Sequence, residues 1–208
     1  RPAPATIMAF AMDHRSQLEQ MAREAGAALE RIVQLKLLAV EATARVANGA
    51  PGYGMLLDGT YGLKALSRAA ELGLWLGRPV EKPGSRPLDF DGMASLGASL
   101  LEWPVAQTVK CLCFYHPDDP EGLRLRQERE LQRVFAASRS TGHELLIEII
   151  ASKNGELRDD TTARVMQRLY ALGILPDWWK LEPQPSEQAW KNCSSVIAGH
   201  DPLCRGVM

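Results

Sequence analysis

The stretch Asp177-Trp178-Trp179-Lys180-Leu181-Glu182-Pro183 predicts a buried strand with a lysine in its middle. Two other short apolar runs carry a charge in the same way. Thr108-Val109-Lys110-Cys111-Leu112-Cys113-Phe114-Tyr115 holds Lys110, and Leu145-Leu146-Ile147-Glu148-Ile149-Ile150 holds Glu148. A charged group inside a buried strand loses its hydration, so it is paired, neutralised or used in chemistry. Three such strands in succession indicate an active site.

Strand-like and helix-like segments alternate along the whole chain. Strands are predicted at Ala5–Met12, Tyr53–Asp58, Pro79–Lys82, Gln107–Tyr115, His143–Ala151, Asp177–Glu182 and Arg205–Met208. Between them, helical periodicity covers Arg15–Asn48, Tyr61–Leu76, Gly92–Trp103, Glu121–Ser140, Asp159–Leu172 and Ser186–Ile197, with Asp159 and Ser186 as N-caps. This alternation predicts an α/β protein with right-handed βαβ units and a parallel sheet.

The element count favours one particular α/β architecture. Seven strands with six helices suit a (β/α)8 TIM barrel better than an open sheet, and no GxGxxG motif follows a strand. We therefore expect residues 1–208 to form one barrel domain that lacks its last helix, strand and helix. Because the chain starts without a methionine, we also expect a fragment or a processed chain.

Composition narrows the function classes. The chain has 208 residues, of which 46% are hydrophobic and 24% charged, and its net charge is -1, so nothing favours nucleic acid or a membrane surface as a partner. No run is long enough to span a membrane, and no signal peptide is recognisable. The four cysteines (Cys111, Cys113, Cys193 and Cys204) fit neither a disulfide framework nor a zinc site, so we expect reduced thiols, a cytoplasmic protein and no metal or other cofactor.

Ionisable residues gather where the predicted strands end, which is where parallel barrels build their active sites. In chain order they are Asp13, His14, Arg15, Asp58, Glu81, Lys82, Lys110, His116, Glu148, Lys180 and Glu182, accompanied by Tyr115. Each has a structural explanation too. Asp13 fits an N-cap and Asp58 a turn, while Glu148 could pair with a lysine and Lys180 with Glu182. Six consecutive strands that direct charge toward one end are harder to explain by packing.

Two lysines among carboxylates suggest Schiff-base chemistry. A lysine amine attacks a ketone only when it is neutral, and burial together with a second ammonium favours the neutral form. A carboxylate such as Glu148 or Asp13 would then move the protons.

At these residues the chain resembles bacterial class I aldolases of the tagatose-1,6-bisphosphate aldolase type. It is most similar to the aldolase-like domain fused behind the sugar kinase 5-dehydro-2-deoxygluconokinase of inositol catabolism. The matching stretches are Ala9–Gln17 (AFAMDHRSQ), Leu56–Gly62 (LLDGTYG), Pro79–Gly84 (PVEKPG), Val109–Pro117 (VKCLCFYHP), Leu145–Ile149 (LLIEI) and Pro176–Glu182 (PDWWKLE).

The resemblance implies a role for each matching residue. Lys180 would form the Schiff base, Lys110 would be the second active-site lysine, and Glu148 and Asp13 the carboxylates that move protons. Lys36 matches a lysine of the first helix, to which the resemblance assigns no role. We expect the remaining charged and polar residues of the site to bind substrate, namely Arg15, Asp58, Glu81, Lys82, Tyr115 and Glu182.

The inositol relatives imply a sugar-phosphate substrate. It is 2-deoxy-5-keto-gluconate 6-phosphate, which is cleaved to dihydroxyacetone phosphate and malonate semialdehyde without a metal. The relatives also imply a fused or cooperating sugar kinase. We expect a homo-oligomer as well, because aldolase barrels usually associate and the unpaired edges of the first and seventh strands would favour association. The phosphate-gripping loop after an eighth strand is not in this sequence, and no GAGD-like kinase motif occurs. Two alternatives stay open: an accessory or regulatory sugar-phosphate-binding barrel with weak catalysis, and a different lysine-dependent barrel enzyme.

Overall fold

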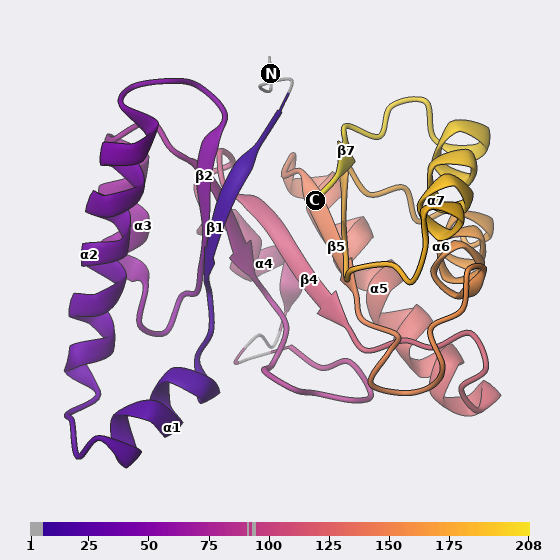
Figure 1. Ribbon diagram of the computed structural model, residues 1–208, viewed down its shortest axis with the longest axis horizontal. Coiled ribbons are helices and arrows are strands. Elements are labelled where there is room, and N and C mark those ends of the chain that lie inside the picture. Colours follow the sequence, from indigo (N-terminus) through magenta and orange to yellow (C-terminus); the bar gives the residue numbers. More distant parts are fainter. Residues whose placement is uncertain (1–5, 91, 93–94) are drawn as a thin grey trace. The chain divides into compact units, whose positions relative to one another are not determined.

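The structure is a computed structural model that describes residues 6–90, 92 and 95–208. Within these residues, seven strands and seven helices follow one another along the chain (Figure 1). They divide into two compact units. The first runs to Pro79 and includes Ala106–Thr108, and the second comprises Val80–Val105 and Val109–Met208. The predicted α/β class with parallel strands is confirmed.

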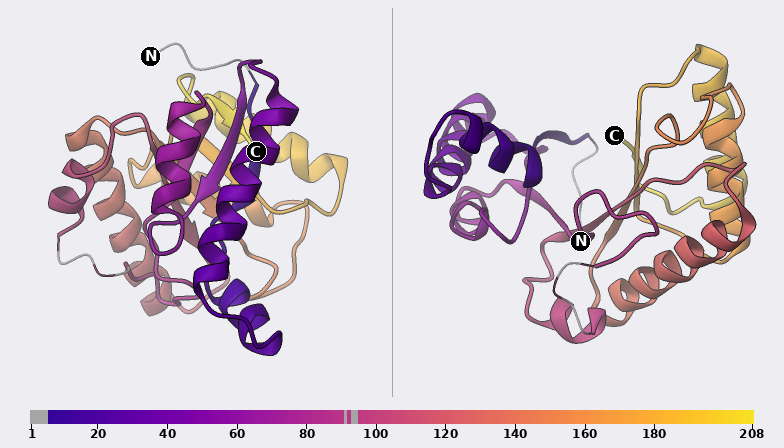
Figure 2. Two further views of the ribbon diagram at one scale, coloured as in Figure 1. Left: turned by 90° about the vertical axis from the view of Figure 1, so that its left-hand side faces the viewer. Right: turned by 90° about the horizontal axis from the view of Figure 1, so that it is seen from below.

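The first unit is a short parallel sheet covered by helices. Its elements are β1 (Met8–Met12), α1 (Ser16–Glu24), α2 (Glu30–Ala47), β2 (Tyr53–Leu57), α3 (Leu63–Glu71) and β3 (Trp75–Pro79). β2 pairs in parallel with both β1 and β3. Both views of Figure 2 show α2 and α3 side by side, and their buried side chains Val40 and Leu66 share one core with Met55 and Leu57 of β2.

The second unit repeats the pattern with four parallel strands. Its elements are α4 (Leu96–Leu101), β4 (Thr108–Cys113), α5 (Glu121–Thr141), β5 (Leu145–Ile149), α6 (Thr161–Ala171), β6 (Trp178–Leu181), α7 (Glu187–His200) and β7 (Gly206–Val207). The pairing β4–β5–β6–β7 is parallel throughout. Ser186 caps α7 as predicted, because its Oγ accepts a hydrogen bond from the backbone N–H of Ala189 at 3.1 Å.

Strand alternation gives the sheet of the second unit two different faces. Cys111 and Cys113 of β4, Ile147 of β5 and Trp179 of β6 belong to the apolar core that this unit shares with its helices. Trp179, for example, donates from Nε1 to the hydroxyl of Tyr170 on α6 at 2.8 Å. The alternate residues of these strands therefore face away from the helices, and they include Lys110, Glu148 and Lys180.

One predicted strand had the wrong boundaries, at the end of the first unit. The third strand is Trp75–Pro79, not Pro79–Lys82, because Trp75 and its neighbours pair with β2. After that strand the backbone N–H of Val80 bonds to the carbonyl of Lys110, and Glu81 forms an isolated antiparallel bridge with Phe90.

The helix predictions need three corrections. The predicted helix over 15–48 is two helices, because the chain after α1 passes through Gly26 at a φ of 61°, a left-handed conformation that breaks a helix. The structure therefore has seven helices in its described part instead of six. The helix predicted over 92–103 is shorter, at Leu96–Leu101, and its positions 93 and 94 lie outside the described residues. The N-cap predicted at Asp159 is Asp160.

Two further expectations concern membrane-spanning helices and disulfide bonds. In the part of the chain that the structure describes, no helix has the length and apolar character that crossing a membrane requires. Cys111, Cys113, Cys193 and Cys204 are free thiols, and the first three are buried.

Candidate functional site

Four charged side chains of the second unit form a continuous chain of ion pairs, which we call the Lys–Glu chain: Glu81, Lys110, Glu148 and Lys180. The ammonium of Lys110 lies 2.9 Å from Oε1 of Glu81 and 2.9 Å from Oε2 of Glu148. The ammonium of Lys180 donates to the other oxygen of Glu148, Oε1. Glu148 thus bridges the two lysines, and the four formal charges cancel.

The strand register brings these residues together. Glu148 on β5 lies directly opposite Lys180 on β6 and opposite Leu112 on β4. Lys110 lies two residues before Leu112 on the same face, so its long side chain reaches Glu148 diagonally. Glu81 enters from the segment after β3, where its second oxygen accepts the backbone N–H of Leu112 at 3.2 Å.

Exposure separates the two lysines. The side chain of Lys110 is 4% exposed and that of Lys180 is 29% exposed, while the carboxylates of Glu81 and Glu148 are 6% and 10% exposed. Lys110 is therefore fixed between two buried carboxylates, and Lys180 is the lysine that a solute can reach.

Glu182, predicted as a substrate contact, binds the loop that follows β5. Its Oε1 accepts the backbone N–H groups of Ala151 at 2.7 Å and Ser152 at 2.9 Å, and its Oε2 accepts the hydroxyl of Ser152. The considered pairing of Glu182 with Lys180 is not what the structure shows, because Lys180 contacts Glu148 instead. Lys82 is exposed in the segment after Glu81, where its backbone bonds to Asp89.

Tyr115, also predicted as a substrate contact, lies on the helix side of the sheet. Its hydroxyl donates to Oε1 of Glu128 on α5 at 2.7 Å, and Arg168 of α6 binds the same carboxylate with both Nε and Nη2. Burial and the bond to Glu128 raise the pKa of Tyr115 well above its usual range. The structure therefore does not bring Tyr115 to the Lys–Glu chain.

The cysteines offer no nucleophile at this site. Cys111 is fully buried on the helix side of β4, and burial raises the pKa of its thiol well above the ordinary value. The thiol consequently stays protonated at neutral pH and is a poor nucleophile.

Three predicted site residues belong to the first unit, where they follow strands β1 and β2. Asp58 is fully buried, and its carboxylate lies 2.6 Å from the ammonium of Lys36 while accepting the backbone N–H groups of two turn residues. Lys36 also donates to backbone carbonyls after β1, including that of His14 at 3.0 Å. Asp58 and Lys36 thus tie the ends of two strands to α2. Asp13 is partly buried and Arg15 is buried. That these residues join the Lys–Glu chain in one site stays a prediction.

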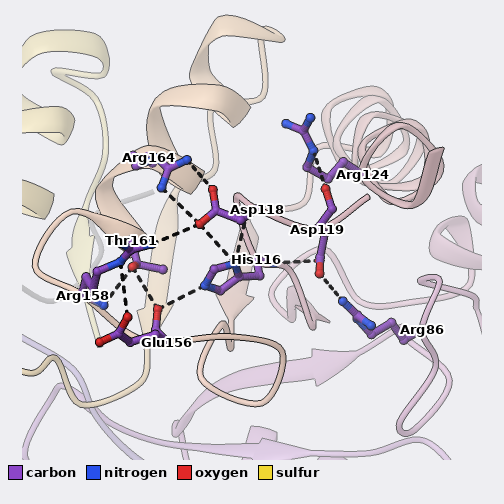
Figure 3. A network of polar contacts seen from close by, with 9 residues as sticks. All are labelled: Arg86, His116, Asp118, Asp119, Arg124, Glu156, Arg158, Thr161 and Arg164. Carbon is purple, nitrogen blue, oxygen red and sulfur yellow. Dashed lines mark hydrogen bonds and ion pairs between the residues drawn. The ribbon is translucent and has the colours of Figure 1, made fainter. Parts of the chain in front are cut away.

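A second polar network in the second unit, to which no function was assigned from the sequence, is centred on His116 (Figure 3). The His116 ring accepts the backbone N–H of Asp118 at Nδ1 and lies 3.2 Å from the carbonyl of Glu156 at Nε2. Since Nδ1 accepts, Nε2 carries the proton and donates. Asp118 also binds Arg158 and Arg164. The network joins the segment after β4 to the loop after β5.

The Asp119 carboxylate extends the network to a third segment. It accepts the backbone N–H of His116 at 3.0 Å and binds the guanidinium of Arg86, while its carbonyl accepts Nε of Arg124 (Figure 3). These contacts fix the loops around the carboxyl ends of β4 and β5, so we assign the network a positioning role.

The Lys–Glu chain has the chemical equipment for carbonyl chemistry. It offers an accessible amine at Lys180, a carboxylate in contact with that amine, and a buried second ammonium. Among the described residues, no cluster of three or more histidine, cysteine, aspartate or glutamate side chains is arranged to hold a metal ion.

Comparison with known proteins adds two findings. Proteins named tagatose 1,6-diphosphate aldolase, from Staphylococcus haemolyticus (strain JCSC1435) and Staphylococcus epidermidis (strain ATCC 12228 / FDA PCI 1200), are each 32% identical over 139 residues, which is 62% of this chain. The chain spans about 40% of the length of these curated relatives. A family model described as "Uncharacterized protein conserved in bacteria (DUF2090)" matches residues 1–208. The chain therefore belongs to this DUF2090 family.

Proposed function

We propose that this protein is a carbon–carbon lyase, a class I aldolase that works through an imine on Lys180. The observation that carries the proposal is the position of Glu148, whose two carboxylate oxygens contact Lys110 and Lys180 separately. A carboxylate in contact with an accessible amine can take up a proton from it and later return one. The similarity to proteins named tagatose 1,6-diphosphate aldolase supports the same reaction class.

The exposed fractions of the two lysines assign them different roles in the proposed reaction. Lys180, at 29% exposure, attacks the substrate ketone, while Lys110, at 4%, stays charged between Glu81 and Glu148. The buried ammonium of Lys110 stabilises negative charge on Glu148, which keeps this carboxylate available as a proton acceptor beside Lys180. Glu81 holds Lys110 in place through its bond to the backbone of β4.

The reaction proceeds in balanced steps. The amine of Lys180 adds to the ketone carbon and water leaves, which forms a protonated imine. Glu148 accepts the proton of the hydroxyl group that is β to the imine carbon. The bond between the α carbon and the hydroxyl-bearing β carbon breaks, the β carbon departs as an aldehyde, and the electron pair moves into the protonated imine to form an enamine. Protonation of the enamine and hydrolysis then release the ketone product and restore Lys180.

Two substrates fit this chemistry. The resemblance in the sequence favours 2-deoxy-5-keto-gluconate 6-phosphate, with the imine at C5 and cleavage between C3 and C4. The names of the relatives favour tagatose 1,6-diphosphate. Both have a ketone with a hydroxyl group at the β carbon, and both would release dihydroxyacetone phosphate. No phosphate transfer by this chain is proposed.

The remaining predictions about the whole protein belong to this proposal. Parallel strands that alternate with helices support a single (β/α)8-type barrel domain over residues 1–208. We also propose cooperation with a sugar kinase in inositol catabolism, on the sequence resemblance alone, and homo-oligomerisation, because aldolase barrels usually associate.

The test is a cleavage assay with each of the two substrates, in which released dihydroxyacetone phosphate is reduced by a coupled dehydrogenase. We expect turnover with one of them, and a loss of at least about 1000-fold in Lys180→Met, because a covalent catalyst cannot be replaced by an apolar side chain. Lys191→Met is the matched control, since Lys191 is paired with Glu187 on the exposed surface of α7. Undiminished turnover in Lys180→Met would contradict the proposed role.

One alternative has an observation in its favour. The alignment covers only 40% of the length of the curated relatives, so the matched part is compatible with a module that binds a sugar phosphate without turning it over. Such a module would bind the substrate of the assay and release no product.

A further inference from the structure

A third cation lies beyond the two lysines of the Lys–Glu chain, in the direction of the carboxyl ends of the strands. The ammonium of Lys153, in the loop after β5, lies 5.0 Å from the centre of the Phe114 ring, which follows β4. Lys153 is exposed and Phe114 is partly buried. A cation over an aromatic face at this distance is held in place by the ring quadrupole.

Phe114 belongs to the same face of the sheet as the Lys–Glu chain. Its neighbours Cys113 and Tyr115 both lie in the helix-side core. Strand alternation therefore turns the ring of Phe114 to the opposite face, which Lys110 and Leu112 share. The pairing of β4 with β5 continues to this level, because the N–H of Ile150 bonds to the carbonyl of Cys113 at 3.2 Å.

The register gives the spacing between this cation and the proposed reacting amine. Glu148 and Lys180 lie opposite each other, and Leu112 lies opposite Glu148. Phe114 is two residues beyond Leu112, which places its Cα about 7 Å further toward the carboxyl ends of the strands. A small ketone with an anionic group a few bonds from its carbonyl carbon would span this interval.

The loop that carries Lys153 is fixed at its start. Glu182 accepts the backbone N–H groups of Ala151 and Ser152 at 2.7 and 2.9 Å, and also the Ser152 hydroxyl. The N–H of Asn154 returns to the carbonyl of Ala151 at 2.9 Å, which closes a turn around Lys153. The backbone on both sides of Lys153 is thus held by specific bonds.

The same loop is fixed at its far side by the His116 network (Figure 3). Nε2 of His116 bonds to the carbonyl of Glu156. The ring packs so closely on Gly155 that a Cβ there would lie 2.6 Å from Nε2. Glu182 and His116 therefore preorganise the loop, which lowers the entropy that binding through Lys153 would lose.

The charge of Lys153 is not neutralised by its surroundings. In the part of the chain that the structure describes, its ammonium forms no ion pair, whereas the nearby network arginines Arg86, Arg158 and Arg164 are each paired with Asp118 or Asp119. A positive group that is positioned but not paired is suited to bind an anion.

We propose that Lys153, held over Phe114, binds the anionic group of the substrate, a phosphate or a carboxylate, while the carbonyl carbon lies at Lys180. This inference rests on the proposed function and adds to it a specificity residue. The residue selects a charged ketone over a neutral one of the same carbon skeleton. Charge selection would arise in the loop after β5, within the second unit itself.

The test is isothermal titration calorimetry with dihydroxyacetone phosphate in the Lys180→Met background, where no imine forms and only non-covalent binding is measured. We expect Lys153→Met in that background to weaken binding by about tenfold or more, as for a lost hydrogen bond to a charged group. Lys191→Met in the same background is the matched control and should change the affinity less than twofold. Neutral dihydroxyacetone should bind equally to all three proteins.

Three outcomes would overturn the inference: no binding of dihydroxyacetone phosphate to Lys180→Met, equal affinity with and without Lys153, or an equal loss in the Lys191 control. The phosphate and carboxylate sources are separated by repeating the titration with hydroxypyruvate, which retains a carboxylate. If the loss is specific to Lys153 but borohydride traps no imine in the protein that retains Lys180, the anion site holds and the aldolase proposal fails. An imine on Lys180 together with an unchanged affinity in Lys153→Met would do the reverse.

Discussion

Replacing Lys110 with methionine should destabilise the second unit more than a substitution that removes the charge of an exposed side chain. Lys110 contacts Glu81 and Glu148 at 2.9 Å each, and its side chain is 4% exposed. Breaking a buried pair by removing one partner costs about 3–5 kcal/mol, because the remaining charge is left buried. Here each carboxylate keeps another donor, Leu112 N–H for Glu81 and Lys180 for Glu148, so we expect the low end, about 3 kcal/mol.

The assay is urea unfolding followed by tryptophan fluorescence and circular dichroism, supported by thermal unfolding. For a chain of this size, about 3 kcal/mol corresponds to a fall in Tm of roughly 6–12 °C. The double variant Glu81→Gln/Lys110→Met removes one charge of each sign and leaves Glu148 paired with Lys180. It should therefore recover part of the lost stability, about 1 kcal/mol or more.

Two results would refute this reasoning. One is an unfolding free energy for Lys110→Met within about 0.5 kcal/mol of the parent, as expected of a surface substitution. The other is a double variant whose loss equals the sum of the two single losses, since additivity would mean that the two side chains do not interact.

Three further predictions concern groups outside the Lys–Glu chain. Burial lowers the pKa of His143 below its ordinary 6.5, so the unfolded chain binds the proton more tightly than the folded protein does. The free energy of unfolding should therefore fall as pH drops below about 6.5. In His143→Gln, urea unfolding between pH 7 and 5 should show a smaller fall in this free energy. Gly155→Ala places a Cβ against the His116 ring and should cost about 1–3 kcal/mol, measured by thermal unfolding; an unchanged Tm would show that the loop moves freely. Arg168→Met leaves the buried carboxylate of Glu128 without its strongest partner and should lower the free energy of unfolding by about 2 kcal/mol at pH 7. Because Arg168 lowers the pKa of Glu128, the difference in unfolding free energy between variant and parent should shrink below pH 4.5. A difference that does not depend on pH would contradict this account.

Hydrophobic pattern was sufficient to predict most strands. The runs that contain Lys110, Glu148 and Lys180 are continuous and bounded by polar or turn residues, so their strands appear within two residues of the predicted ends. The third strand was misplaced because Trp75 and Leu76 continue the periodicity of the preceding helix, and only pairing with β2 reveals them as a strand.

The candidate site was predictable only in part. Strand order and a period of two explain why Lys110, Glu148 and Lys180 share a face. The choice of partners was not predictable, because it depends on register and on loops. Glu81 reaches back to Lys110, and Glu182 turns to the backbone of Ala151 and Ser152, although the sequence allowed both to be substrate contacts. Phe114 could have been found by extending the same alternation beyond Lys110.

The most direct test of the central claim is reductive trapping of the intact protein. It is incubated with dihydroxyacetone phosphate and sodium borohydride, digested, and mapped by mass spectrometry. The account predicts a covalent adduct on the peptide that contains Lys180, absent in Lys180→Met and present in Lys191→Met. An adduct on Lys110 instead would contradict the assignment of the accessible lysine, and no adduct on a folded protein would contradict the imine mechanism itself.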